Sequence, residues 1–315
     1  MKFFDRKLDL VVYTDTQAYT IKNLHMDFNI LLRKPKKTKK KEQQQPKPNQ
    51  AQIVIFNLSE DTRGLFTEAH RGIDFKAGYG EDVSLIFRGN TVNVFHENLK
   101  PGWMTTIFAS DGHKEWSTAN FNKSYSRGTP ITVILSDLGL AMGMPAKIDY
   151  SRADTLLVGA SYSGKVKDVL NIVCGNYDLT WSIQNGSLEI IDTLVPNIFE
   201  DTQKTVLLSS DTGMIGSPII QEESRNESGK DKKQKQDKHF FTVLARSLLN
   251  PEFFPGVPVK FEARNPVTDF NRAAEIRSSE IRLSNIFICN KVNHIGSNYT
   301  NEYVTEIETE EREIL

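Results

Sequence analysis

One segment of the sequence has the residue types and spacing of a phosphate-binding loop. Residues 159–165 read Gly-Ala-Ser-Tyr-Ser-Gly-Lys, two glycines separated by four residues and followed by lysine. In a genuine site, backbone N–H groups and the N-terminus of the next helix surround the phosphates, and Lys165 reaches their outer oxygens. The following residue is Val166, which lacks the hydroxyl that coordinates Mg²⁺. Two interpretations stay open, a nucleotide site or a glycine turn that connects a strand to a helix.

The other residues that could support catalysis, namely Asp, Glu, Ser and His, do not occur at the spacings of known catalytic or metal-binding motifs. The run that ends at Asp192 imitates a second acidic nucleotide-binding motif, but it lies in a predicted hairpin, and no G-x-S-x-G motif is present. The histidines are isolated and are expected to be surface or half-buried rings: His25, His70, His96, His113, His239 and His294. Five acidic residues are expected at turns: Asp74, Glu81, Asp82, Asp111 and Asp192. We therefore expect no catalytic residue, no cofactor and no metal site.

Charge is nearly balanced but unevenly distributed. The 315 residues contain 39 Lys and Arg against 40 Asp and Glu, a balance that argues against a protein whose main partner is a polyanion. Seven of the nine residues 33–41 are basic, five of the nine residues 230–238 are Lys, and the last fourteen residues contain six Glu. Both Lys-rich segments lack apolar residues, so we expect mobile loops over 33–50 and 222–238. Contact of these loops with nucleic-acid phosphates is the alternative interpretation.

The chain has no sequence signal for a membrane or for export. No stretch approaches the roughly 18 consecutive apolar residues of a membrane helix, and the N-terminal residues lack the apolar core of a secretory signal. We expect a soluble protein without membrane insertion. Cys174 and Cys289 are the two cysteines and are expected to be buried thiols.

The elements that surround these residues are mostly strands. Alternating runs rich in Val, Ile and Phe predict strands at short spacing, typical of a barrel or sandwich, at 8–14, 51–58, 72–79, 82–98 and 105–112. The same pattern returns at 205–211, 217–223, 239–249, 258–264, 285–296 and 301–310. Gly78, Gly80 and Gly89 are expected at turns or bulges. The Pro-rich segment 248–259 predicts a rigid corner.

Two helices are expected between these groups of strands. The first begins with Thr129 as N-cap and Pro130 at N1, has apolar residues at steps of three and four, and ends near Gly139 or Gly143. The second follows residues 159–165 and has Gly175 as a plausible C-cap. After it, Asn185-Gly186 predicts a type I′ hairpin turn. A Ser-Tyr-Ser triplet precedes each helix, at 124–126 and 161–163, an echo that is either a small repeat or chance.

The order of these motifs resembles the baseplate hub proteins of long-tailed bacteriophages, whose relatives include the N-terminal part of type VI secretion spike proteins. The resemblance covers nearly the whole chain, and its specificity lies in the order of IFNLSEDTRGLF, AGYGEDVSLIFRGNTVNV, TTIFASDG, NKSYSRGTPITVILSDLG, SYSGKVKDVLN, WSIQNGSLEII, SLLNPEFFPGVPVKF and KVNHIGSNYTNEYVTEIE. Residues 59–64 match a link between strands of the first barrel, residues 78–89 match its next hairpin, and Leu249-Asn250-Pro251 with Pro255-Gly256 match a corner of the second.

The resemblance implies an α+β, mostly β fold with two barrel-like β domains and a small inserted α/β domain. On this chain the first barrel would span 1–103 and the second 104–112 with 193–315, while the inserted domain would span 113–192. The two Lys-rich insertions depart from the simplest family pattern. The segment 159–165 falls in the inserted domain, which gives it a structural explanation without a nucleotide.

The resemblance also implies a role in assembly and not in catalysis. The protein would be a homotrimer in the tail baseplate of a virion, made in the host cytoplasm. It would join a sixfold tail tube protein to a threefold central spike protein and form part of the DNA conduit, with baseplate wedge and tape measure proteins as further partners. The base of a type VI-like secretion spike and a nucleotide-binding enzyme that uses Gly159–Lys165 are the alternatives.

Overall fold

The computed structural model of the protein describes residues 5–34, 47–149, 158–192, 204–225, 238–263, 267–268 and 286–311. Its main sheet has fourteen strands. Seven lie in the first 110 residues: β1 (Arg6–Tyr13), β2 (Ala18–Ile21), β3 (Met26–Arg33), β4 (Gln50–Phe56), β5 (Gly72–Tyr79), β6 (Asp82–Asn98) and β7 (Trp103–Ser110). The other seven are β13 (Val206–Ser209), β14 (Met214–Arg225), β15 (Lys238–Leu248), β16 (Pro258–Glu262), β17 (Val267–Thr268), β18 (Ile286–Ser297) and β19 (Tyr303–Glu311).

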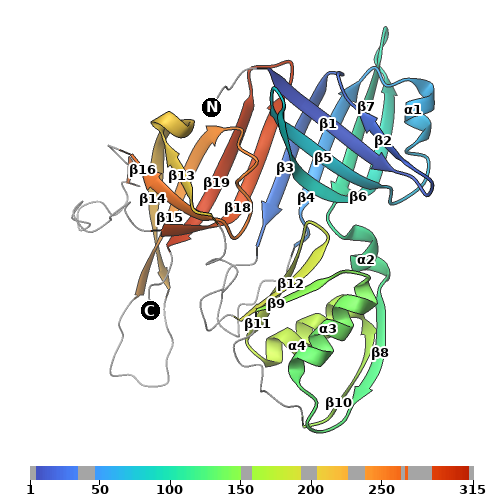
Figure 1. Ribbon diagram of the computed structural model, residues 1–315, viewed down its shortest axis with the longest axis vertical. Coiled ribbons are helices and arrows are strands. Elements are labelled where there is room, and N and C mark those ends of the chain that lie inside the picture. The colour runs from blue at the N-terminus through green and yellow to red at the C-terminus, as the bar shows by residue number, and fades with distance from the viewer. Residues whose placement is uncertain are drawn as a thin grey trace.

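Strands from both ends of the chain share this sheet. The neighbouring strands are, in order, β17, β14, β15, β19, β18, β3, β4, β7, β6, β5, β1 and β2, while β16 pairs with β18 and with β13. The antiparallel pair β18–β3 joins the two groups (Figure 1). The expected mostly β class is therefore confirmed. The strand pairs of the described residues leave the sheet open, so closure into two barrels is not confirmed.

A smaller α/β unit lies at one end of the main sheet (Figure 1). Its elements are α2 (His113–Thr118), β8 (Asn120–Tyr125), α3 (Ile131–Met142), β9 (Ala146–Asp149), β10 (Ala160–Lys165), α4 (Val166–Asn176), β11 (Leu179–Gln184) and β12 (Ser187–Asp192). β8 pairs with β10, while β11, β12 and β9 form a three-stranded sheet. Two short elements remain, the helix α1 (Glu60–Gly64) and the 3-10 helix η1 (Ser210–Thr212). The boundaries expected for the inserted domain and for the two barrels stay predictions.

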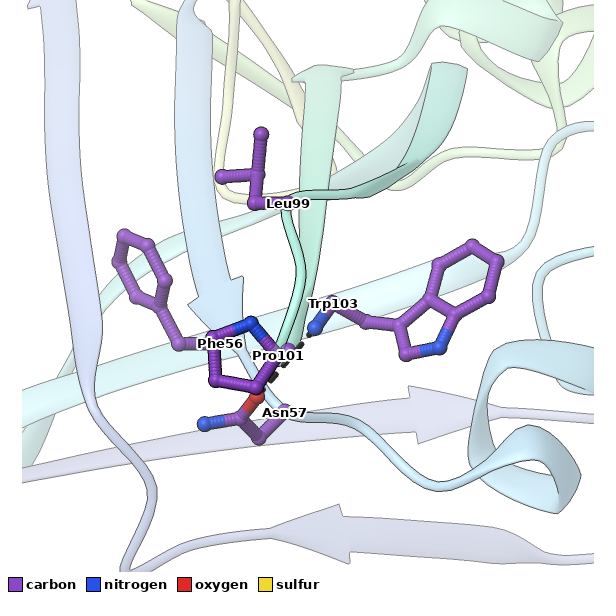
Figure 2. Close-up of a pocket in the computed structure, with 6 residues that line it drawn as sticks. Phe56, Asn57, Leu99, Pro101 and Trp103 are labelled. Carbon is purple, nitrogen blue, oxygen red and sulfur yellow. Dashed lines mark hydrogen bonds between the residues drawn. The ribbon is translucent and has the colours of Figure 1, made fainter.

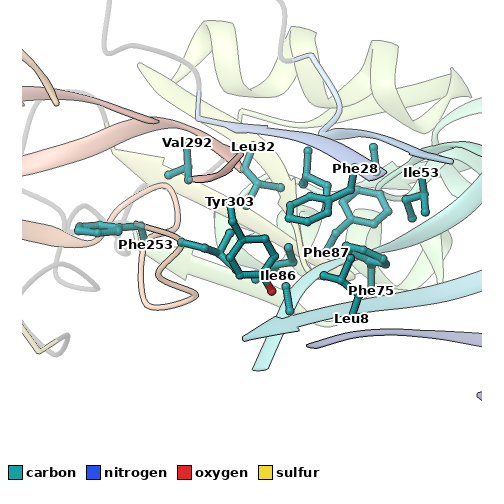
Figure 3. Close-up of a cluster of buried hydrophobic side chains, with 14 of the residues drawn as sticks. Leu8, Phe28, Leu32, Ile53, Phe75, Ile86, Phe87, Phe253, Val292 and Tyr303 are labelled. Carbon is teal, nitrogen blue, oxygen red and sulfur yellow. The ribbon is translucent and has the colours of Figure 1, made fainter. Parts of the chain in front are cut away.

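Two apolar cores hold the protein together. The larger one lies under the main sheet and takes side chains from both groups of strands, including Phe28, Phe75, Phe87, Phe253 and Tyr303 (Figure 3). The smaller one lies between α3, α4 and the strands of the α/β unit. Full burial of one such large apolar side chain stabilises the fold by ~2 kcal/mol. The alternation of apolar and polar residues along the strands is what directs one face of the main sheet to its core.

The expected strands are confirmed, and so is the hairpin turn of the α/β unit. Asn185 and Gly186 have φ angles of 50° and 76°, the left-handed values that a type I′ turn requires at both central positions. Among the glycines, Gly80 has φ 59° at the β5–β6 turn. Gly89 lies within β6. A Cβ at this position would meet the carbonyl oxygen of Ser110 on β7 at 2.6 Å, so the close approach of the two strands requires glycine. Gly89 therefore does not lie at a turn.

The helix ends differ from the expected ones by one or two residues. Pro130, not Thr129, is the N-cap of α3, and the helix ends at Gly143 with φ 69°. Gly175 was the expected cap of α4, but it lies inside this helix, which continues to Asn176. The chain takes a left-handed conformation only later, at Asp178 with φ 54°. Asp can adopt this conformation, so a glycine is not required there.

The two Lys-rich segments fall largely outside the described residues. Residues 35–46 lie between the paired strands β3 and β4, and residues 226–237 lie between the paired strands β14 and β15. Residues 222–225 were expected in the second loop but belong to β14. In the part of the chain that the structure describes, no helix is long and apolar enough to span a membrane.

Candidate functional site

The segment that resembles a phosphate-binding loop is a strand. Residues Ala160–Lys165 form β10, which pairs antiparallel with β8, and Lys165 is the N-cap of α4. The two Ser-Tyr-Ser triplets therefore meet at one residue pair, with Ser124 Oγ 2.9 Å from Ser161 Oγ. A phosphate-binding loop needs several backbone N–H groups turned toward one point, whereas a strand points them alternately to opposite sides. The strand-to-helix connection is the interpretation that fits this geometry.

The acidic residues that the structure describes do not gather into a catalytic pair. Asp74 was expected at a turn, but it lies within β5, is 3% exposed and binds Arg88 on β6. Asp111 directly follows β7 and is also buried. Asp82 begins β6 after the turn that contains Glu81, as expected. Among the described residues, no three His, Cys, Asp or Glu side chains are placed to hold a metal ion.

The histidines and cysteines lie in different parts of the fold. The rings of His70 and His113 are 5.3 Å apart, and His25 stacks on Phe56 at 4.3 Å. His294 is fully buried, where its Nδ1 lies 2.9 Å from Thr305 Oγ1 and burial lowers its pKa to about 4. It was expected at the surface or half-buried. The two cysteines are buried thiols, as predicted, and belong to different cores.

A buried polar joint connects the main sheet to the α/β unit. Asp111 accepts hydrogen bonds from the backbone N–H groups of Asn185 at 2.8 Å and Gly186 at 3.3 Å. Asn49, just before β4, donates from Nδ2 to Gln184 Oε1 at 3.0 Å. Gln184 in turn donates to the carbonyl of Arg33 at 2.9 Å. The β11–β12 hairpin is thus fixed to the ends of β3, β4 and β7.

The charge of Asp111 is enclosed in this joint. Burial raises the pKa of Asp111 to about 6, against the hydrogen bonds from Gly186, Asn185 and Asn49, which lower it. Glu115 on α2 adds to the rise. A second contact between the main sheet and the hairpin is an ion pair, in which Lys34 Nζ after β3 lies 3.0 Å from Glu189 Oε2 on β12. Sequence spacing gave no sign of this joint, because partners such as Arg33 and Gln184 lie 151 residues apart in the chain.

Eight neighbouring strands of the main sheet form one continuous surface. We call it the outward face: the side chains of β14, β15, β19, β18, β3, β4, β7 and β6 that point away from the main core. One row of cross-strand partners runs through Leu248, Val304, Ile295, Asn29, Gln52, Phe108 and Asn93. A second row runs through Ile215, Arg246, Glu306, Asn293, Leu31 and Gln50. The helices α3 and α4 pack on strands of the α/β unit, away from this face (Figure 1).

Oppositely charged side chains pair with each other in the middle of the outward face. Arg246 Nη2 lies 2.8 Å from Glu302 Oε1, and its Nε lies 3.7 Å from Glu306. Lys291 Nζ lies 3.7 Å from Glu308 on the next strand. These exposed pairs contribute little stability, typically below ~1 kcal/mol each. They leave the described middle strands of this face without a basic excess that would retain a polyanion.

At the end of the sheet opposite the α/β unit, the β6–β7 turn forms an open apolar pocket of about 500 Å³. Phe56, Leu99, Pro101 and Trp103 line it, and Figure 2 shows the Trp103 indole turned away from the ring of Pro101. Asn57 Oδ1 accepts a hydrogen bond from the N–H of Trp103 at 3.3 Å. This end of the sheet is a preformed apolar surface at the tip of a hairpin.

Comparisons with known proteins show similarity of fold without similarity of sequence. No known protein family matches the sequence, and no curated protein matches it. A tail protein from Neisseria meningitidis MC58 has a TM-score of 0.59 over 98% of this chain and 97% of that chain, at 10% identity. The 43 kDa tail protein of prophage MuSo2 from Shewanella oneidensis has a TM-score of 0.58 over 96% of each chain, at 6% identity.

A third similar structure comes from a secretion system. It is a component of the E. coli type VI secretion system that itself resembles tail proteins of bacteriophage T4. It has a TM-score of 0.57 over 92% of this chain and 74% of that chain, at 8% identity. The fold of this chain is therefore the fold of phage tail proteins and of type VI spike-related proteins, as the order of the sequence motifs indicated.

Proposed function

We propose that this chain is the baseplate hub subunit of a phage tail. Three copies form a ring that joins the sixfold tail tube to the threefold central spike and surrounds part of the DNA conduit. The observation that carries this proposal is the outward face, a single eight-stranded surface that spans the chain. A protein in which strands from both ends of the chain build one continuous surface is suited to assembly and not to catalysis.

The arrangement of strands in the outward face supports the match between threefold and sixfold symmetry. Four of its strands, β3, β4, β7 and β6, lie in the first 110 residues, and the other four, β14, β15, β19 and β18, lie in residues 214–311. Each copy thus offers two four-stranded units side by side. Three copies around one axis place six such units in a ring, which is the number that a sixfold tube requires.

The charge of the outward face supports its place on the inside of the ring. DNA that passes through a conduit must not be held there, and phosphate contacts need a basic excess. Arg246 and Lys291 are each paired with a glutamate, so the face offers no such excess in its described middle. The pocket at Leu99 lies at the free end of the sheet and is the surface we assign to the tail tube protein.

Mass and shape in solution test the proposal. Light scattering should give the mass of three chains, and electron microscopy should give a ring with a central hole. Coexpression with the tail tube and central spike proteins of the same gene cluster should yield a complex, and Leu99→Asp should weaken its tube contact while sparing the spike contact. A monomer that binds neither partner would overturn the proposal.

The base of a type VI-like secretion spike is a second candidate, favoured by the fold shared with the E. coli type VI component. The same ring would then receive a secretion tube in place of a phage tube. The two functions differ in which spike and tube proteins bind, so coexpression with each set decides between them. In the phage case we place the protein in the virion baseplate after synthesis in the host cytoplasm, with wedge and tape measure proteins as its further neighbours.

A further inference from the structure

Exposed apolar side chains on the outward face lie at its two lateral edges. On β14, Ile215 and Ile219 are each 40% exposed. At the opposite edge, Phe95 on β6 is 57% exposed and Phe108 on β7 is 38% exposed. In the described parts of the eight strands, these four are the large apolar side chains that are more than a third exposed. The strands between them carry the two rows described above, in which the apolar side chains of Leu248, Val304, Ile295 and Leu31 are buried or half-buried.

The four side chains belong to the same face. Ile219 is the cross-strand partner of Leu244, which is the partner of Glu308. Ile215 is the partner of Arg246, which is the partner of Glu306. At the other edge, Phe108 is the partner of Gln52, and the rings of Phe95 and Phe108 are in edge contact with centroids 6.0 Å apart. Side chains at the two margins therefore project to one side of the sheet, with the charged pairs of Arg246 and Lys291 between them.

The backbone at these margins is also incompletely paired. β5 pairs with β6 as far as Asn90, and the N–H of Thr91 still donates to the carbonyl of Arg71, so residues 92–98 of β6 have β7 on one side and an open edge on the other in the described structure. On β14, the strand β17 covers only Ile219 and Ile220 of the outer edge in the described residues. An open strand edge with exposed apolar side chains is a surface for association.

We propose that the β14 margin of one copy packs against the β6 margin of the next copy, with Ile215 and Ile219 against Phe95 and Phe108. The two margins lie at opposite sides of one chain, so they cannot meet within it. Contact between unlike surfaces of identical chains repeats from copy to copy and closes a ring when the rotation allows it. Pro218 has no backbone N–H to donate, and β17 already pairs with Ile219 and Ile220, so side chains and not backbone pairing carry this seam. The inference rests on the ring of the proposed function and names its interface.

Charge introduced at either margin tests the seam. Phe95→Glu and Ile219→Glu should each shift the protein from trimer to monomer in light scattering, with a dissociation constant at least ~30-fold higher, the loss expected for a central buried contact. Leu140→Glu is the matched control, because Leu140 on α3 is 76% exposed and lies outside the seam. It should leave the trimer intact. Unchanged circular dichroism would show that all three variants fold.

A mixture of the two variants separates this seam from other modes of association. Phe95→Glu retains its β14 margin and Ile219→Glu retains its β6 margin. In a mixture these two intact margins can bind each other, but each copy has no second intact margin, so the mixture should form dimers that do not grow into rings. A twofold contact between like margins would give no recovery on mixing. As a milder check, the double variant Phe95→Cys with Ile219→Cys should form disulfide-linked oligomers that neither single variant forms, since Cys174 and Cys289 are buried.

The outcomes separate the two proposals. A wild-type monomer would overturn the ring itself and with it the seam. A wild-type trimer that both Glu variants leave intact, without cross-linking of the double Cys variant, would overturn the seam and leave the ring with a different interface.

Discussion

Arg88 holds the buried carboxylate of Asp74 from the neighbouring strand, through hydrogen bonds from Nε at 2.7 Å and from Nη2 at 2.6 Å. The hydroxyl of Tyr13 on β1 donates a third bond at 2.9 Å. Burial raises the pKa of Asp74, but the bonds from Arg88 and Tyr13 outweigh burial and hold this pKa below its ordinary value. The ion pair therefore ties β5 to β6, and the hydrogen bond from Tyr13 adds β1.

Arg88→Met should destabilise the protein by about 2 kcal/mol at pH 7. The loss of a partner of a buried charge costs about 3–5 kcal/mol, and the half-exposed Arg88 side chain reduces this figure. Since the pKa of Asp74 is lowered by folding, its charged form stabilises the fold above pH ~4, and this contribution disappears as the pH falls. Urea unfolding should thus show a gap between wild type and variant that narrows below pH ~4.

The exposed pair of Arg246 with Glu302 provides the control for this prediction. Both side chains are about half exposed, so Arg246→Met should change the free energy of unfolding by less than ~1 kcal/mol. Equal losses for the two Arg variants would contradict a special role of the Asp74 pair.

Comparison of wild type with Asp111→Asn should show a stability that falls as the pH rises, the opposite of what an ordinary paired carboxylate gives. Folding raises the pKa of Asp111 to about 6, so between pH ~4 and ~6 the folded protein binds a proton that the unfolded chain has released. The stability of the wild type relative to the variant should therefore fall as the pH rises through this window, by up to about 3 kcal/mol at 1.4 kcal/mol per pKa unit. Urea unfolding at pH 4.5, 5.5 and 7 measures the difference, and a constant difference would contradict the prediction.

The strands, the type I′ turn and the buried cysteines could be predicted from sequence because each depends on residues close to one another. Asn185-Gly186 carries its own turn geometry, for example. The outward face could not be derived from local pattern, because it depends on pairing of Asn293 with Leu31 at opposite ends of the chain. The resemblance to hub proteins supplied the mostly β class, but not the single sheet that joins both groups of strands.

The candidate site was harder to predict than the fold. Gly159 and Gly164 have φ angles of 115° and 134°, so both glycines are needed for the backbone, as they would be in a phosphate-binding loop. Only the pairing of β10 with β8 separates the two cases. Asp74 was expected at a turn because Asp is common there, and its partner Arg88 is fourteen residues further along the chain. The apolar margins of the outward face gave no signal, because Phe95 and Ile219 lie in ordinary strand patterns.

Lys165→Ala should not change the response of the protein to nucleotides, because we expect neither wild type nor variant to bind them. Lys165 is the last residue of β10, opposite Asn120 of β8, and the position after it carries no hydroxyl for Mg²⁺. Titration of wild type with ATP and Mg²⁺ should give no binding heat, and the melting temperatures of wild type and variant should not respond to ATP. A rise in the wild-type melting temperature that Lys165→Ala removes would restore the nucleotide site.

Gly89→Ala should destabilise the main sheet by about 1–3 kcal/mol, the usual cost of overpacking a tight interior. A Cβ at this position would meet Ser110 O at 2.6 Å and Phe87 Cζ at 2.7 Å, so either β7 or the Phe87 ring must shift. Gly64 at the end of α1 is the control, since a Cβ there has no atom within 4 Å. Gly64→Ala should be neutral or slightly stabilising, because alanine reduces the freedom of the unfolded chain. Thermal unfolding of both variants measures the contrast, and equal melting temperatures would show that β6 and β7 are less tightly apposed at Gly89 than the structure places them.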